Sequence, residues 1–173
     1  MRSMLVAAFI AIGSPAAAGD LDRLFEQAIG GEFNKPAHRE PQVLVFVSLS
    51  MPTASLVRLA RDAHRAGATV FLRGFKDDSL AKTREALLPI LREVNPAPAI
   101  QIHPNAFSTY GVTTVPTVVL TRSTASAESM PYAAVVGDVS LRYALEHLSR
   151  TAGEFAPIAR ERAERLQFIG RAH

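Results

Sequence analysis

Five consecutive apolar residues, Val43 to Val47, limit most strongly how this chain can fold. A strand with one face in water alternates apolar and polar residues, whereas an uninterrupted apolar run is typical of a strand that is covered on both faces. Residues 42–48 are therefore predicted to form a central strand of an α/β sheet. Residues 69–73 read as a second strand, and a helix up to about residue 66 joins the two into a right-handed β-α-β unit.

The start of that helix carries the first candidate site residues, Ser50, Met51 and Pro52. Ser50 is predicted to be the N-cap, and Pro52 suits the first helical position because its missing N–H is not needed there. Ser50 acting as a nucleophile would need an adjacent base, and His64, about three turns down the same helix, cannot reach it. We therefore favour the capping role for Ser50. Gly67 is expected to end the helix in a left-handed conformation.

The later elements complete the pattern of an α/β fold. Asp77 or Asp78 is predicted to cap the next helix, Pro89 to kink or break it, and Ser140 or Asp138 to cap the last helix of the sheet domain. The predicted helices span residues 79–94, 104–110 and 139–150, and the predicted strands span residues 99–103, 117–121 and 131–136. The resulting order, β-α-β-α-β-α-β-β-α, predicts a mixed sheet flanked by helices, with an inserted helix and a C-terminal helical tail.

The first 41 residues have the pattern of an export signal followed by a helix and a linker. Arg2, a short apolar run at residues 5–12 and the small residues before Gly19 are typical of a secretory signal peptide, with cleavage expected after Ala18. The apolar run is far shorter than the ~20 residues that span a membrane. We therefore expect an exported protein without a stable membrane span. Residues 20–32 predict an amphipathic helix, and residues 34–41 a linker.

Residues 151–173 follow the predicted sheet domain, which covers residues 42–150, and contain a charged helix. Arg160, Glu161, Arg162, Glu164 and Arg165 dominate it, and few apolar residues accompany them. Such a charge run is most often a solvated helical tail. The alternative is that this tail docks on a partner.

Composition excludes several kinds of chemistry. The chain has no cysteine, so its own residues cannot supply the thiolate that thiol–disulfide exchange needs. Its five histidines are not at metal-ligand spacing and no glycine-rich phosphate loop is present. A net charge of +3 is too small to indicate nucleic acid. We predict no catalytic residue, no metal and no cofactor.

The segment from Gly111 to Leu120 carries the second half of the candidate site, Thr114, Val115 and Pro116. Cis peptide bonds occur almost only before proline, and about 5% of X–Pro bonds are cis. A strand, a helix start and a later proline before another strand resemble the thioredoxin fold, in which a cis-proline faces the helix start across the active site. This resemblance implies a groove between residues 50–52 and 114–116, where a loop edge at Thr113 to Val115 could pair with an extended peptide and Met51 could add an apolar contact. The alternative is that these atoms serve internal packing alone.

Four stretches together resemble the F-type conjugative transfer pilin-assembly family TrbC: residues 45–52, 56–60, 67–74 and 110–117. The resemblance covers residues 42–137. It implies a periplasmic, thioredoxin-like but non-redox assembly factor for the conjugative pilus of a type IV secretion system, with a TraW-like assembly protein as partner. Two alternatives stay open: a chaperone-like binder of extended peptide or pilin at the Pro116 edge, and a degenerate oxidoreductase that acts with a partner's thiol.

Overall fold

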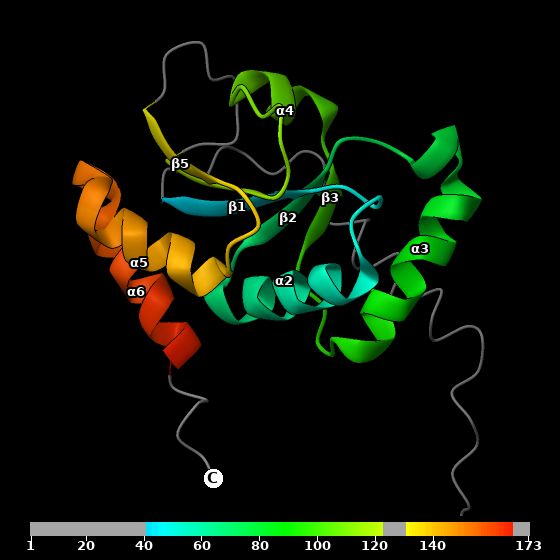
Figure 1. Cartoon of the computed structure of the whole chain (residues 1–173), viewed down its shortest axis with the longest axis horizontal. Helices are drawn as coiled ribbons and strands as arrows, with labels where there is room; N and C mark the ends of the chain where they lie inside the picture. The colour runs from blue at the N-terminus through cyan, green and yellow to red at the C-terminus, as the bar shows by residue number, and fades with distance from the viewer. Residues whose placement is uncertain (1–40, 123–130, 168–173) are drawn as a thin grey trace, which may run out of the picture.

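A five-stranded mixed sheet lies in the middle of the computed structural model, which describes residues 41–122 and 131–167 (Figure 1). Its strands are β1 (Gln42–Val47), β2 (Thr69–Leu72), β3 (Ile100–Ile102), β4 (Thr117–Thr121) and β5 (Tyr132–Val136). The spatial order is β3-β2-β1-β4-β5, in which the first three are parallel and the pairs β1–β4 and β4–β5 are antiparallel. The central place of β1 confirms what its apolar run predicts.

Helices cover both faces of this sheet, but unequally. They are α2 (Thr53–Ala66), α3 (Leu80–Glu93), α4 (Pro104–Thr109), α5 (Leu141–Thr151) and α6 (Ala156–Gln167), with short 3-10 turns at Lys76–Asp78 and Gly153–Phe155. In Figure 1, α2, α5 and α6 lie below the sheet, α3 lies to its right and α4 lies above it. The arrangement is the predicted thioredoxin-like α/β fold.

Two hydrophobic clusters hold the layers together. The odd-numbered valines of β1, Val43, Val45 and Val47, face α2, α3, α5 and α6 in the larger cluster. The smaller cluster is aromatic and lies under α4. There the ring of Phe46 meets Phe71 and Phe107 edge to face, with centroids 5.4 and 4.8 Å apart. Burial on both faces explains why β1 is apolar from Val43 to Val47.

The start of α2 differs from the prediction. Pro52 and not Ser50 is the N-cap, and no side chain caps this end. The Met51 N–H donates to the Ser48 carbonyl at 3.1 Å, so residues 48–51 form a tight turn that keeps Ser50 outside the helix. The Ser50 hydroxyl instead hydrogen-bonds the Ser48 hydroxyl at 2.8 Å. At the other end, Gly67 adopts the predicted left-handed conformation, with φ 63°.

Serines cap the helices α3 and α5. Ser79, and not Asp77 or Asp78, caps α3 by accepting a hydrogen bond from the Lys82 N–H at 3.3 Å. Both aspartates have positive φ in the turn before the helix. Pro89 does not break α3, which is one helix from Leu80 to Glu93. Ser140 caps α5, as one of the two predicted alternatives.

The charged C-terminal helix is packed on the sheet domain and is not a solvated tail. Phe155, Ala159 and Ala163 are buried and belong to the larger cluster. Arg162 Nη1 donates to the Ala66 carbonyl at 3.1 Å, which ties α6 to the end of α2. The predicted signal peptide at residues 1–18 and the predicted helix at residues 20–32 lie outside the described residues.

Candidate partner-binding site

The register between β1 and β4 brings the two halves of the predicted site to the same end of the sheet. Phe46 lies opposite Thr117, so the next step of the antiparallel ladder places Val47 opposite Pro116. The turn at residues 48–52 and the loop at residues 113–116 therefore leave the sheet side by side. This is the carboxyl end of the parallel strands β1 and β2, where α/β proteins usually bind their ligands.

The Val115–Pro116 peptide bond is cis, as the resemblance to thioredoxins leads us to expect. The loop before it uses some of its hydrogen-bonding groups internally. The Thr117 hydroxyl donates to the Thr114 carbonyl at 2.6 Å, and the Gly137 N–H donates to the Pro116 carbonyl at 3.0 Å. The backbone of Val115 forms no hydrogen bond with the described residues. The backbone of Thr113 likewise forms no hydrogen bond with the described residues, so Thr113 and Val115 both have groups available for an added strand.

Arg73 holds this loop in place, and the sequence analysis assigned it no role. It follows β2 directly, and its Nη2 donates to the Val112 carbonyl at 2.9 Å. Its guanidinium also lies over the Phe107 ring, 4.9 Å from the centroid. The sequence does contain a signal, because Arg73 is a charged residue immediately after a buried strand at the ligand-binding end of the sheet.

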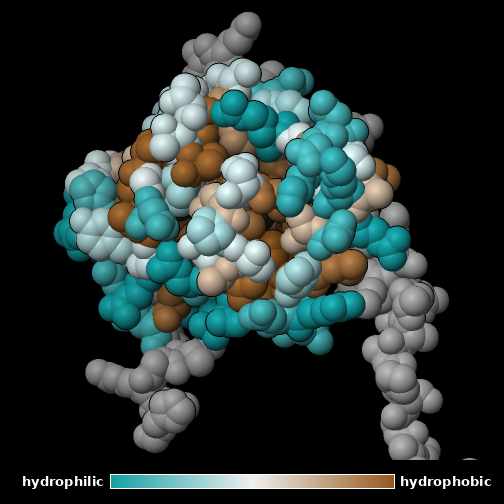
Figure 2. Space-filling model, turned by 45° about the vertical axis from the view of Figure 1, so that its right-hand side comes forward, coloured by the Kyte–Doolittle hydropathy of each residue, from teal (hydrophilic) through white to brown (hydrophobic). Residues whose placement is uncertain are grey.

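Apolar surface surrounds the turn on its other side. Met51 is half-buried and packs against the larger cluster, and next to the turn a small recess of about 20 Å³ lies between the sheet, α2 and α3. Every residue that lines the recess is apolar, Leu49 and Leu87 among them. Figure 2, which brings the α3 side forward, shows brown hydrophobic surface between hydrophilic rims. Contact with an apolar partner group is the chemistry that this region can support.

Nothing in this region resembles a catalytic centre. The hydroxyls of Ser48 and Ser50 hydrogen-bond each other. Burial raises the pKa of Asp62 and of Tyr110, and a hydrogen bond from Arg142 lowers the pKa of Glu146. None of these three groups belongs to the turn or the loop. In residues 41–122 and 131–167 no cluster of His, Asp or Glu could hold a metal ion.

The described helices also include none that is long and apolar enough to cross a membrane. Taken together, the fold and the site define a thioredoxin-like α/β protein without cysteine at the position of the redox motif.

Residues 45–148 match the family described as the type-F conjugative transfer system pilin assembly protein, TrbC, and the chain belongs to this family. The chain is also similar to the periplasmic protein TrbC of Escherichia coli (strain K12), with 30% identity over 131 residues. The matched part is 76% of this chain and 57% of the relative, so the chain spans little more than half of that protein. No solved structure matches the chain.

Proposed function

We propose that this protein is a periplasmic assembly factor for the conjugative pilus and that it acts by protein–protein contacts, without redox chemistry. The observation that carries the proposal is the composition of the site. Residues 50–53 correspond by resemblance to the redox motif of thioredoxins, and they hold a serine bonded to Ser48 and a half-buried methionine, beside a loop edge whose Val115 backbone forms no hydrogen bond with the described residues. Such groups suit contact with an apolar, extended partner, and no adjacent base activates the serine hydroxyl as a nucleophile.

The family supplies the setting for these contacts. Its members are pilin assembly proteins, and the relative in Escherichia coli is periplasmic. The partners that we propose are other periplasmic assembly proteins, a TraW-like protein among them, and the pilin itself. Ser50, Met51, Pro52, Thr114, Val115 and Pro116 form the proposed contact surface, together with Arg73, which anchors the loop through Val112.

A second candidate function is chaperone-like binding of an extended pilin segment. The specific observation in its favour is that the backbones of Thr113 and Val115 form no hydrogen bond with the described residues, whereas the Thr114 and Pro116 carbonyls are occupied. Two alternate residues of this kind can form a short β-bridge with a passing strand but not a long ladder. The contact would therefore involve few hydrogen bonds, which suits transient binding.

A degenerate oxidoreductase that borrows a partner's thiol is the third reading, and it has less support. Ser48 and Ser50 satisfy each other, and hydroxyls of serine cannot replace thiolates in exchange.

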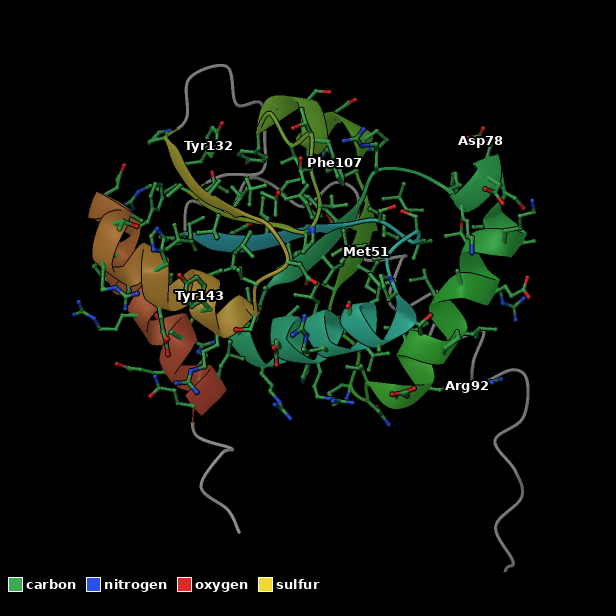
Figure 3. The ribbon with its side chains drawn as sticks, viewed as in Figure 1. Met51, Asp78, Arg92, Phe107, Tyr132 and Tyr143 are labelled. Atoms are coloured by element: carbon green, nitrogen blue, oxygen red, sulfur yellow. The ribbon has the colours of Figure 1, made fainter. Side chains whose placement is uncertain are left out.

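Site-specific photo-crosslinking in cells that carry the complete transfer apparatus tests the proposal. A crosslinker replaces Met51 in the turn, and a second one replaces Tyr143, which is 52% exposed on α5. Figure 3 shows Tyr143 to the left on α5 and Met51 to the right in the turn, so Tyr143 serves as an exposed control outside the proposed site. A third probe replaces Glu164 on the outer side of α6.

We expect Met51 to capture pilin or an assembly protein and Tyr143 to capture neither. If Glu164 captures a partner while Met51 stays silent, the contact surface lies on α6 and the proposed site is wrong. Capture of pilin alone favours the chaperone-like function over the function of an assembly factor that binds other assembly proteins. Replacement of Met51 by Glu is expected to lower plasmid transfer while leaving the amount of folded protein unchanged.

A further inference from the structure

Strand β5 is the edge of the sheet, and no described residue pairs with its outer side. The strand reads Tyr-Ala-Ala-Val-Val and contains no charge and no proline. Edge strands of soluble proteins normally carry a lysine, a proline or a bulge that prevents pairing with another chain. The absence of these protections from β5 indicates that its outer edge is available to pair with a strand of another chain.

The hydrogen-bond alternation of the sheet shows which groups β5 offers. The Gly137 N–H points toward β4, because it donates to the Pro116 carbonyl at 3.0 Å. Backbone groups of an antiparallel strand point alternately to its two neighbours. Val135 and Ala133 therefore also bond to β4, whereas the N–H and C=O groups of Tyr132, Ala134 and Val136 point outward.

The same three residues share one face of the sheet and leave apolar surface in water. Tyr132 is 44% exposed and Val136 is 59% exposed, and Ala134 between them is exposed as well. The short helix α4 covers this face only in part. It is followed by Tyr110, whose ring meets the edge of Tyr132 with centroids 5.3 Å apart. Figure 3 shows Tyr132 on the α4 side of the sheet.

We propose that β5 pairs with β5 of a second copy of this chain and joins two sheets into one. An antiparallel pairing centred on Ala134 is self-complementary, because it sets Ala134 against its own copy and Tyr132 against Val136 of the other copy. It uses all three outward pairs of N–H and C=O groups, for about six hydrogen bonds. Each Tyr–Val contact is an aromatic–β-branched cross-strand pair, which stabilises antiparallel sheets.

The uncharged strand permits pairing with its own copy. A charged strand of either sign would repel its own copy at the twofold axis, whereas β5 presents no such repulsion. One five-residue strand buries less surface than the ~1,200 Å² at the lower end of stable interfaces. We therefore expect a weak, concentration-dependent dimer with a dissociation constant of roughly 10–100 µM.

Sedimentation of the purified chain over concentrations that bracket this value tests the pairing. Ala134→Lys places two ammonium groups opposite each other at the centre and is expected to raise the dissociation constant at least about tenfold. Leu80→Lys is the matched control, because Leu80 is an apolar side chain with 56% exposure on α3, and it should leave the dimer intact. An equal mixture of Ala134→Lys and Ala134→Glu should restore association as a heterodimer. Circular dichroism establishes that each variant is folded.

A single introduced cysteine gives an independent readout, since the chain has none of its own. Directly opposed residues in a hydrogen-bonded pair have Cα atoms about 5.5 Å apart, which a disulfide can span. Ala134→Cys should therefore oxidise to a linked dimer much faster than Leu80→Cys. A wild-type chain that stays monomeric across the whole range overturns the proposal, and so does a dimer that Ala134→Lys leaves unchanged.

Discussion

Replacing Gly67 by alanine tests how α2 and α6 are joined. Gly67 ends α2 with φ at +63°, a conformation that is strained for residues with a Cβ atom. A Cβ atom built there would lie 2.7 Å from Arg162 Nη1 and 3.3 Å from Arg165 Nη1. It would therefore displace the guanidinium that donates to the Ala66 carbonyl at 3.1 Å. The substitution perturbs both the backbone of the helix end and its contact with α6.

The two effects can be estimated separately. A left-handed alanine costs about 1–2 kcal/mol of unfolding free energy. The hydrogen bond from Arg162, together with the favourable position of a cation at the C-terminus of α2, contributes about 1 kcal/mol at this half-buried site. Gly67→Ala should therefore cost about 2–3 kcal/mol in total, and Arg162→Ala about 1 kcal/mol. In the Arg162→Ala background, Gly67→Ala should cost only the backbone part.

Urea unfolding followed by circular dichroism gives the free energies of the four proteins in this double-mutant cycle. We expect a coupling of about 1 kcal/mol between the two positions. Costs that add to within about 0.5 kcal/mol would show that the guanidinium does not hold the helix end, and the structural reasoning would be refuted.

Three further predictions follow from individual side chains. Phe155→Ala should lower the free energy of unfolding by about 3–5 kcal/mol because Phe155 is buried. Leu80→Ala, at an exposed site, should lower it by less than about 1 kcal/mol. Equal urea midpoints for the two variants would contradict the packing of the C-terminal segment. Arg73→Ala frees the Val112 carbonyl and should lower the crosslinking yield at the turn about fivefold, and a full yield would show that the loop needs no anchor. Burial raises the pKa of Asp62 above its ordinary value, because the charged carboxylate is poorly solvated in the folded protein. The free energy of unfolding therefore falls as the pH rises through the pKa of Asp62 in the folded state. Asp62→Asn should therefore be more stable than the wild type near neutral pH and equally stable in acid. The gain should be no more than about 0.5 kcal/mol, because the site is half exposed and screened. Thermal unfolding at both pH values measures the difference, and a gain found only in acid would contradict the prediction.

The proposed contact site and the proposed dimer strand lie in two different regions of the sheet. The turn and loop lie at the carboxyl end of β1, and β5 lies at the edge of the sheet. A dimer through β5 would leave both copies of the turn accessible. Two such sites in one assembly would raise the apparent affinity for a partner that repeats, as a pilus subunit does.

Local patterns in the sequence determined the elements of this fold. The apolar run of β1 required burial on both faces, and Gly67 required a left-handed helix end, because both properties depend only on residue type and near neighbours. The motifs around Ser50–Pro52 and Thr114–Pro116 identified the family and both halves of the candidate site. The absence of cysteine removed thiol chemistry from the chain's own residues before any coordinates were considered.

Tertiary structure decided what lies between these elements. Ser50 has the composition of an N-cap, but the turn closed by Met51 keeps it outside the helix. The charged helix α6 reads as a tail, yet Ala159 and Ala163 bury it against α5 and α2, since small side chains leave room for close helix packing that hydropathy does not register. The anchoring of the loop by Arg73 joins residues 39 positions apart in the chain, and the exposure of β5 depends on how little of the sheet α4 covers. Long-range contacts of this kind are set by the packing of the whole chain, which no local pattern contains.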